Sequence, residues 1–326
     1  MAAPLDTFSW HSETLSRALV ARSDCDILTE LIVLRDQGNA SKNVDTHFEK
    51  AREKTRNTDE IEKSFATAYD NAMENINRMV WIPRTFNFLD LGSAPGGFTQ
   101  YLLRKNRRAH GMGISLPREQ GGNGFAVTYS DYLARYELHW ADLTTFDLAP
   151  SIPKPATANH DYPPLPFEPG SRDLVLCDAQ WVLNPDNLKR PLARGNIFIR
   201  LSCVERTLTG RILLALCRIS DLVRTVKSTQ FQAVRSYFYV LAQRVHPQSN
   251  ECKELISALE RLWYTMTFEG ENGYGRDISA KDEELITTDE EMLGEKGLST
   301  IIQLGTPIWE IQYDALCHFL SRRGVV

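Results

Sequence analysis

The stretch that decides the fold is Phe86-Asn-Phe-Leu-Asp90-Leu-Gly92-Ser-Ala-Pro95-Gly96-Gly97-Phe98-Thr99-Gln100. An apolar run ends in Asp-Leu-Gly, and a turn of small residues then leads into a segment that favours a helix. At the carboxyl end of a parallel strand, such a turn lets the backbone approach a ligand closely, and the free N–H groups at the helix start face that ligand. The pattern therefore indicates a site for a nucleotide-like ligand.

The order Asp-Leu-Gly-x-x-Pro-Gly-Gly-Phe resembles motif I of methyltransferases that use S-adenosylmethionine (SAM), and in particular that of the FtsJ-like family of RNA ribose 2′-O-methyltransferases. The resemblance implies SAM as the cofactor. It implies these cofactor-binding residues in the motif: Asp90, Gly92, Ser93, Ala94, Pro95, Gly96, Gly97 and Phe98. A plain strand–helix connection needs fewer glycines. An NAD-type dehydrogenase fits less well, because the spacing is not Gly-x-Gly-x-x-Gly and no acid ends the second strand.

Strand-like and helix-like stretches alternate from Phe86 to about Val245, which favours a mostly parallel sheet with helices on both faces. The predicted strands are Phe86–Leu91, His110–Leu116, Tyr136–Trp140, Asp173–Cys177, Arg211–Cys217 and Phe231–Ala242, with a crossover helix at Gly97–Lys105. The last strand is long enough for two antiparallel strands or one bent strand, and the resemblance implies a final antiparallel hairpin there. The predicted fold class is therefore α/β, with the Rossmann-like sheet of the SAM-dependent methyltransferases.

Helical segments flank this central part. Ile61–Val80 has one apolar face at three- and four-residue spacings, and the end of the chain returns to amphipathic helices. We therefore expect a helical N-terminal extension at 1–84, a SAM-binding domain at 85–247 and a helical C-terminal addition at 248–326. Within the domain, residues 150–170 hold seven prolines and form an inserted loop, either a lid over the substrate side or a spacer.

Two further candidates for the cofactor site follow the second and third predicted strands. Many nucleotide-binding sheets place an acid after the second strand, where it accepts from the ribose hydroxyls. The FtsJ-like pattern predicts an acid there, but the sequence has Ser115, which can make a hydrogen bond without the charge. After the third strand, the resemblance places Asp142 against the adenine amino group. A helix N-cap or a turn is the alternative role for Asp142.

Asp178 directly follows the strand Asp173–Cys177, at the sheet edge where the resemblance places the cofactor's methyl group. It matches the acid of motif IV, so we expect it to be catalytic and to contact the cofactor. The resemblance implies a Lys-Asp-Lys-Glu tetrad in which a lysine with a lowered pKa deprotonates the ribose 2′-hydroxyl. Only Asp178 is kept, because the other positions fall on Asp70, Ala215 and Tyr237. Lys63 and Lys227 are lysines that could approach the site from elsewhere.

Three hypotheses about the chemistry remain open. In the first, the chain is a methyltransferase with a different acceptor or base, because proximity and orientation alone lower the barrier substantially. Its available proton acceptors are then Asp178, Tyr237 and His246. In the second, it is a pseudo-methyltransferase that keeps the SAM pocket as a binding or regulatory module. In the third, Asp178-Ala-Gln-Trp181 is an altered Asp-Pro-Pro-aromatic motif of amino-group methyltransferases, although both prolines are missing.

Two aromatic residues are candidates for substrate binding. Trp181, beside the methyl-transfer position, can stack on a base or another planar acceptor, or it can close the pocket by packing. Tyr237 is either a contact for the acceptor or a packed strand residue.

The composition and the net charge give limited information about the binding partners and the cellular compartment of the protein. The 326 residues carry a formal charge of −5 and have a pI of about 5.9, so the net charge leaves RNA open as a partner without supporting it. A small-molecule acceptor is also possible, and the sequence leaves any protein partner unknown. The start lacks a signal peptide and no apolar run is long enough to span a membrane, so we expect no membrane partner. Six scattered cysteines and the spacing of the histidines predict reduced thiols in the cytoplasm or nucleus and no metal site.

Overall fold

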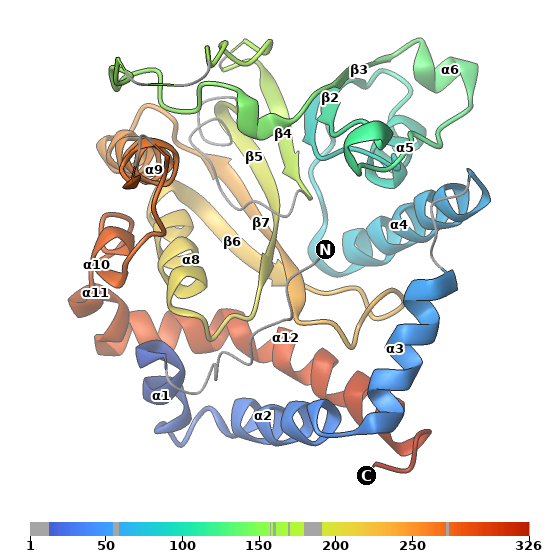
Figure 1. Cartoon of the computed structure of the whole chain (residues 1–326), viewed down its shortest axis with the longest axis vertical. Coiled ribbons are helices and arrows are strands. Elements are labelled where there is room, and N and C mark those ends of the chain that lie inside the picture. The colour runs from blue at the N-terminus through green and yellow to red at the C-terminus, as the bar shows by residue number, and fades with distance from the viewer. Residues whose placement is uncertain are drawn as a thin grey trace.

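The computed structural model describes residues 13–54, 59–156, 158, 161–168, 170–178, 191–271 and 274–325. A mixed sheet lies at its centre, with helices on both faces (Figure 1). The described strands are β1 (Asn87–Leu91), β2 (His110–Ser115), β3 (Tyr136–Trp140), β4 (Arg172–Cys177), β5 (Pro191–Ser202), β6 (Ser220–Val226) and β7 (Tyr237–Val245). The described helices are α1 (Thr14–Val20), α2 (Asp26–Asn39), α3 (Lys42–Lys54), α4 (Asp59–Val80), α5 (Gly97–Lys105), α6 (Ser130–Leu133), α8 (Thr207–Ile219), α9 (Asn250–Phe268), α10 (Ala280–Glu283), α11 (Asp289–Leu293) and α12 (Glu295–Ser321), with short 3₁₀ turns η2 (Arg118–Gln120) and η3 (Leu143–Thr145).

The described strands form one seven-stranded sheet in the order β3-β2-β1-β4-β5-β7-β6. Strands β1 to β5 pair in parallel, whereas β7 runs antiparallel to both β5 and β6. The strand order reverses between β1 and β4, and open α/β sheets bind ligands outside the carboxyl ends of the strands at such a point. The predicted α/β sheet is confirmed, and the turn after β1 lies at this switch point.

The central strands are buried on both faces because helices cover both. In β4, Leu174 and Leu176 belong to one buried cluster, which also contains Met73 of α4. Val175 and Cys177 belong to the other cluster, which extends into α8, α9 and α12. Burial on both faces explains why this parallel strand is a continuous apolar run rather than an alternating one.

The prediction of a strand at Arg211–Cys217 is wrong, because these residues belong to α8. A short apolar run does not by itself distinguish a strand from a buried helix. Most of α8 is buried between the sheet and the C-terminal helices, so the run shows little of the polar face that would reveal a helical period. The strand that precedes α8 is β5, which is absent from the strands predicted above.

The antiparallel hairpin is present but is shifted along the chain. It consists of β6 and β7, and residues 231–236 belong to the loop between them rather than to a strand. β7 adds to the sheet between β5 and β6, so its first residue lies at the sheet edge where β5 ends. The loop that joins the hairpin therefore reaches the same edge of the sheet as the turn after β1.

The described part of the proline-rich insertion packs on the body of the protein. The N–H of Asp147 donates to the carbonyl of Pro163 at 2.8 Å, and Phe167 is buried in the core. The ring of Tyr162 lies edge-on against Trp263 of α9, with 5.4 Å between the ring centres. These contacts hold the second half of the insertion against α9.

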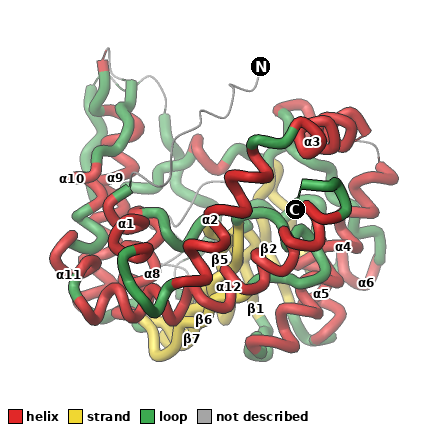
Figure 2. Tube along the Cα trace, turned by 90° about the horizontal axis from the view of Figure 1, so that it is seen from below, coloured by secondary structure: helices red, strands yellow, loops and turns green. Residues whose placement is uncertain are grey.

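Helices from both ends of the chain pack together, and α2 lies alongside α12 (Figure 2). Arg35 of α2 forms an ion pair with Glu205, which follows β5, and also donates to Gln312 Oε1 of α12 at 2.7 Å. The indole N–H of Trp309 donates to the second carboxylate oxygen of Glu205 at 3.2 Å. Burial alone would raise the pKa of Glu205, but Arg35 and these hydrogen bonds hold it below its usual value. This buried ion pair joins α2 to the sheet and to α12.

Within the described residues, none of the helices combines the length and the apolar character needed to cross a membrane. The same residues hold no group of three or more His, Cys, Asp and Glu side chains arranged for a metal ion. All six cysteines lie among them and are free thiols.

Candidate active site

The turn after β1 has the conformation that its glycines predict. Gly92 and Gly96 have φ angles of 87° and 101°, which residues with a Cβ rarely adopt. The N–H groups of Gly92 and Ser93 both donate to the carbonyl of Ile114 in β2, at 2.9 and 3.3 Å. Gly96 is the N-cap of α5, so the turn leads from the end of β1 directly to a helix N-terminus, where N–H groups are free to meet a ligand.

Two glycines of this turn are also required by the packing of the protein itself. A Cβ at Gly96 would lie 2.6 Å from Cγ2 of Val127, and a Cβ at Gly97 would lie 2.4 Å from the carbonyl oxygen of Ala66 in α4. The helix α4 and the segment through Val127 therefore pack directly on the turn. A bulky residue at position 96 would disturb folding as well as ligand binding, which makes it a poor probe of the site.

Asp90 is buried beneath the turn, and only one of its carboxylate oxygens is satisfied. The Thr99 hydroxyl donates to Oδ2 at 2.7 Å, whereas Oδ1 has no hydrogen-bond partner among the described residues. The same is true of the buried Ser93 hydroxyl. Burial, with a smaller contribution from Asp178, raises the pKa of Asp90 to about 7. A buried carboxylate oxygen without a partner is costly, and a cationic ligand offsets that cost.

The other predicted cofactor residues lie around the same sheet edge, but their side chains already contact the protein. Ser115 Oγ, at the end of β2, accepts from the N–H of Ala94 at 3.2 Å. Asp142, after β3, accepts from the N–H and the hydroxyl of Thr144 at 2.8 and 2.7 Å, which makes it the N-cap of η3. The Phe98 side chain is buried in the core. Contacts of these three residues with a cofactor stay a prediction.

Asp178 lies where β4 ends, beside the end of β1, because its N–H donates to the carbonyl of Leu91 at 3.2 Å. Its side chain is only 16% exposed. Arg200 Nη1 lies 3.3 Å from Oδ1, and the hydroxyl of Tyr239 donates to the same oxygen at 3.1 Å. Burial raises the pKa of Asp178 to about 6, and Arg200 and Tyr239 oppose that shift. A carboxylate with this pKa can accept a proton near neutral pH.

Arg200, not Ala215, occupies the tetrad position in the strand next to Asp178. The expectation of Ala215 depended on a strand at Arg211–Cys217, which is part of the helix α8. The parallel neighbour of β4 is β5, and it carries Arg200 at the level of Asp178. The sequence holds a signal for this residue, since a short apolar run after Gly195 ends in this arginine.

The other two tetrad positions are also filled by different side chains. Asp70 of α4 pairs with Arg104 of α5 at 3.0 Å. The hydroxyl of Tyr237, at the start of β7, donates to Gln232 Oε1 at 2.5 Å. The guanidinium of Arg200 lies 5.3 Å from the centre of the Tyr237 ring. Arginine and tyrosine therefore surround Asp178 where the resemblance implies a lysine and a glutamate.

Lys227 is buried next to this cluster. Its Nζ lies 5.2 Å from the centre of the Tyr237 ring and donates to the carbonyls of Arg235, at 2.5 Å, and of Tyr237. Burial, aided by the charge of Arg35, lowers the pKa of Lys227 to about 7. Two of its protons are committed to backbone carbonyls, so Lys227 holds the loop before β7 in place.

The remaining candidates lie elsewhere. His246 follows the far end of β7 and pairs with Asp221 at 2.6 Å, at the sheet edge opposite to Asp178, so it is not a proton acceptor for this site. Lys63 is on the exposed face of α4. Trp181 lies outside the described residues, so stacking and packing both remain predictions for it.

Comparisons with known proteins point to one family. The model of the FtsJ-like methyltransferases matches residues 70–263. A search of curated protein sequences finds no match. Similar solved structures include a Plasmodium falciparum protein described as a ribosomal RNA methyltransferase, at 13% identity and a TM-score of 0.35, with 55% of this chain and 96% of that chain covered. Another is an O-methyltransferase family protein from Burkholderia thailandensis, at 12% identity and a TM-score of 0.37, with 69% of this chain and 73% of that chain covered.

At these TM-scores the structural likeness adds nothing to the family match. That match extends over more than half of the chain, and it includes both the turn after β1 and Asp178. The chain therefore belongs to the FtsJ-like methyltransferase family, whose cofactor is SAM.

Proposed function

We propose that this chain is a SAM-dependent methyltransferase in which Asp178, held by Arg200 and Tyr239, accepts the proton of a hydroxyl acceptor. The observation that carries the proposal is the buried Asp178 carboxylate beside the turn that follows β1. When bound, SAM supplies a methyl group on a sulfonium, which a nucleophile attacks directly. The bond between this methyl group and the acceptor oxygen would form as the sulfur–methyl bond breaks, its electron pair staying on the sulfur of the leaving S-adenosylhomocysteine, and the hydroxyl proton passes to Asp178.

The protein's own residues support both halves of this reaction. Arg200 and Tyr239 favour the ionised form of Asp178 and fix its orientation. The carboxylate is therefore ready to take up a proton before the substrate that receives the methyl group binds. SAM carries an ammonium group as well as its sulfonium, and both are cationic. Asp90 Oδ1 and the Ser93 hydroxyl are buried polar atoms without partners among the described residues, which fits the binding of this cationic amino acid portion.

The acceptor follows from the family resemblance alone, which favours a ribose hydroxyl of RNA. Near α5, Arg104 and Lys105 both pair with Glu74 of α4, so these two cations are less available to RNA phosphates. A small molecule with a hydroxyl group is the alternative acceptor. Reduced cysteines favour the cytoplasm or the nucleus as the compartment.

The second candidate function is a SAM-binding pseudo-methyltransferase. It is favoured by the replacement of the tetrad lysines and by the occupation of Asp178 Oδ1 by both Arg200 and Tyr239. Under this hypothesis the cluster stabilises the fold, and the chain binds SAM without transferring its methyl group.

One experiment separates the two functions. The protein is titrated with SAM and with S-adenosylhomocysteine by calorimetry, and it is then incubated with tritiated SAM and pools of capped RNA, ribosomal RNA and small molecules. Binding together with transfer of tritium to one pool supports the enzyme. Binding with no transfer to any pool supports the pseudoenzyme, and the absence of binding at millimolar ligand contradicts both.

Replacing Asp90 with asparagine is expected to stabilise the free protein and to weaken SAM binding. Asp90 has a pKa of about 7 in the folded protein against a usual value of 3.8, so the folded state loses stability as pH rises between these values. Asparagine stays neutral, so above pH 7 the free energy of unfolding of Asp90→Asn should exceed that of the wild type by about 1–3 kcal/mol. Urea denaturation and calorimetry measure the two effects, and tighter or unchanged SAM binding in the variant would contradict this role of Asp90.

A further inference from the structure

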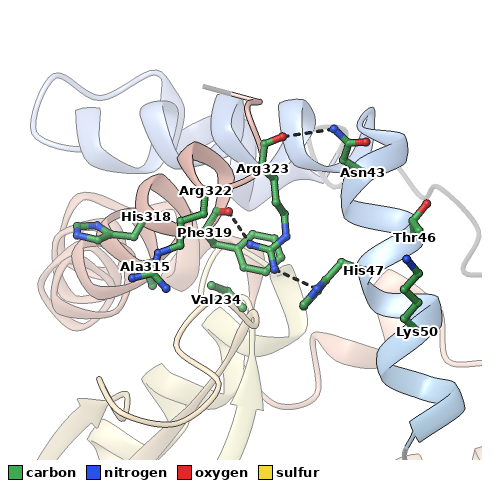
Figure 3. Close-up of a pocket in the computed structure, with 10 residues that line it drawn as sticks. All are labelled: Asn43, Thr46, His47, Lys50, Val234, Ala315, His318, Phe319, Arg322 and Arg323. Carbon is green, nitrogen blue, oxygen red and sulfur yellow. Dashed lines mark hydrogen bonds between the residues drawn. The ribbon is translucent and has the colours of Figure 1, made fainter.

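A separate pocket lies between α3, the last turns of α12 and the loop that joins β6 to β7 (Figure 3). It has a volume of about 740 Å³, within the range of sites for small ligands. Side chains of α3 and α12 face each other across it, and Val234 comes from the loop. None of the residues proposed above for SAM binding or for catalysis lines this pocket.

The lining of this pocket is strongly cationic. Lys50, Arg322 and Arg323 contribute three positive charges, and His47 and His318 add two imidazoles, while no lining residue is an Asp or a Glu. In the part of the chain that the structure describes, neither Lys50 nor either of the two arginines forms an ion pair with a carboxylate. This distinguishes them from Arg104, Arg118 and Arg200, which do. Like charges in one pocket repel one another, and a bound anion reduces that repulsion.

Basic residues at the end of a helix have a simpler explanation, because they interact favourably with its C-terminal dipole. This explanation covers Arg322, which is the C-cap of α12, and Arg323, which follows it. It does not cover Lys50, which lies in α3, on the opposite side of the same pocket. Cations from two helices therefore line one pocket, and this is what indicates a ligand site.

Arg323 is held in one orientation, as a binding guanidinium should be. It donates through Nη1 to the carbonyl of Phe319 at 2.8 Å and through Nη2 to Nδ1 of His47 at 3.0 Å. Its Cζ lies 3.6 Å from the centre of the Phe319 ring. A guanidinium fixed in this way loses little freedom on binding and presents several donors in one plane, which suits phosphate oxygens.

The aromatic side chain of the pocket argues against recognition of a base by stacking. The ring of Phe319 is covered by Arg323 and also stacks on Phe48, with 5.7 Å between the ring centres. Both neighbours occupy ring surface that a base would need. The available groups are therefore charged donors, and their chemistry matches phosphate rather than a nucleobase.

We propose that this pocket binds a phosphate-bearing ligand through Lys50, Arg322 and Arg323. The phosphate has two conceivable sources, a free phosphorylated compound and the backbone of an RNA strand. The loop that supplies Val234 also carries Gln232, which accepts the hydrogen bond of Tyr237, so the pocket and the Asp178 cluster share one segment of chain. The proposal concerns binding alone and does not depend on methyl transfer.

The test compares the wild type with the double variant Lys50→Gln/Arg322→Gln. The matched control is Arg107→Gln/Arg108→Gln, which removes two exposed cations next to α5 and changes the net charge equally. Inorganic pyrophosphate is titrated by calorimetry, and a single-stranded RNA oligonucleotide is titrated by fluorescence anisotropy at several salt concentrations. SAM affinity and the thermal midpoint are measured for each protein, so that loss of folding is detected separately.

The pocket variant should bind pyrophosphate at least about tenfold more weakly, because two charged donors have been replaced by neutral amides, while the control variant should match the wild type. If RNA phosphates occupy the pocket, the slope of log K against log salt should also fall in magnitude by about 0.7 for each phosphate that the variant no longer neutralises. Weakened pyrophosphate binding with unchanged RNA binding identifies a free phosphorylated compound as the ligand. Equal behaviour of the two double variants with both probes, or no binding of either probe by the wild type at millimolar concentration, overturns the proposal.

Discussion

Replacing Asp178 with asparagine is expected to lower methyl transfer by about 10²–10⁴-fold, the usual contribution of a positioned general base. Asparagine keeps the shape of the side chain and an oxygen that can accept from Tyr239, but it cannot accept the proton of the acceptor. It also removes the ion pair with Arg200. The decrease should appear in kcat, because the reaction lacks a group that acts in the transition state.

The measurement is tritium transfer from SAM to the acceptor that the pool experiment identifies, together with the SAM dissociation constant and the thermal midpoint of each variant. The matched control is Asp221→Asn, because Asp221 lies at the opposite edge of the sheet, where it pairs with His246 and Arg244. The control should keep the activity of the wild type. Wild-type turnover in Asp178→Asn would show that this carboxylate is not the proton acceptor.

The pH dependence of the wild type gives an independent check on the same group. Asp178 must be ionised to accept a proton, and its pKa is about 6. The value of kcat/KM for the acceptor, measured at saturating SAM so that the titration of Asp90 does not contribute, is therefore expected to rise as pH increases through about 6 and then to level off. A profile that instead rises through the pKa of Lys227, about 7, and persists in Asp178→Asn would assign the base to that lysine.

Replacing Glu205 with alanine is expected to destabilise the protein by about 3–5 kcal/mol, because removing one partner of a buried ion pair leaves the other charge buried without compensation. Arg35 is the charge that remains, and the indole N–H of Trp309 is left without its acceptor. The effect is large because this carboxylate joins three parts of the chain, namely α2, the segment after β5 and α12.

Urea denaturation measures this destabilisation, and Glu295→Ala is the matched control. Glu295 also pairs with an arginine of the N-terminal region, Arg22, but its side chain is 76% exposed. An exposed ion pair contributes only about 0–1 kcal/mol, so the control should differ little from the wild type. Equal destabilisation of the two variants would contradict this explanation, since burial would then make no difference.

The sequence predicted the parts of the fold in which local pattern and tertiary environment agree. The crossover helix Gly97–Lys105 and the strand Tyr136–Trp140 have the predicted bounds. A glycine turn marks the start of the helix, and the strand alternates between apolar and polar residues. The turn after β1 was predictable for the same reason. The family resemblance then follows from this one motif, and it implies the α/β sheet that the structure has.

The error at α8 has a physical cause, which is burial. In α8 the residues Ile212 to Leu216 are apolar on all sides, so the period that separates a helix from a strand is hidden. Misplacing that strand moved the tetrad position from Arg200 to Ala215. The pairing of Arg200 with Asp178 depends on two neighbouring strands meeting in register, and a single sequence holds no direct record of that register.

The cofactor site itself can be probed without knowing the acceptor, by calorimetric titration of the wild-type protein and of Asp90→Asn with SAM at a series of pH values. We expect the wild type to bind SAM, with an affinity that increases as pH rises towards the pKa of Asp90, about 7, because the cationic ligand favours the ionised carboxylate. This increase should be reduced in Asp90→Asn. The absence of measurable heat with the wild type at millimolar SAM across this range would contradict the assignment of a cofactor site to the turn after β1.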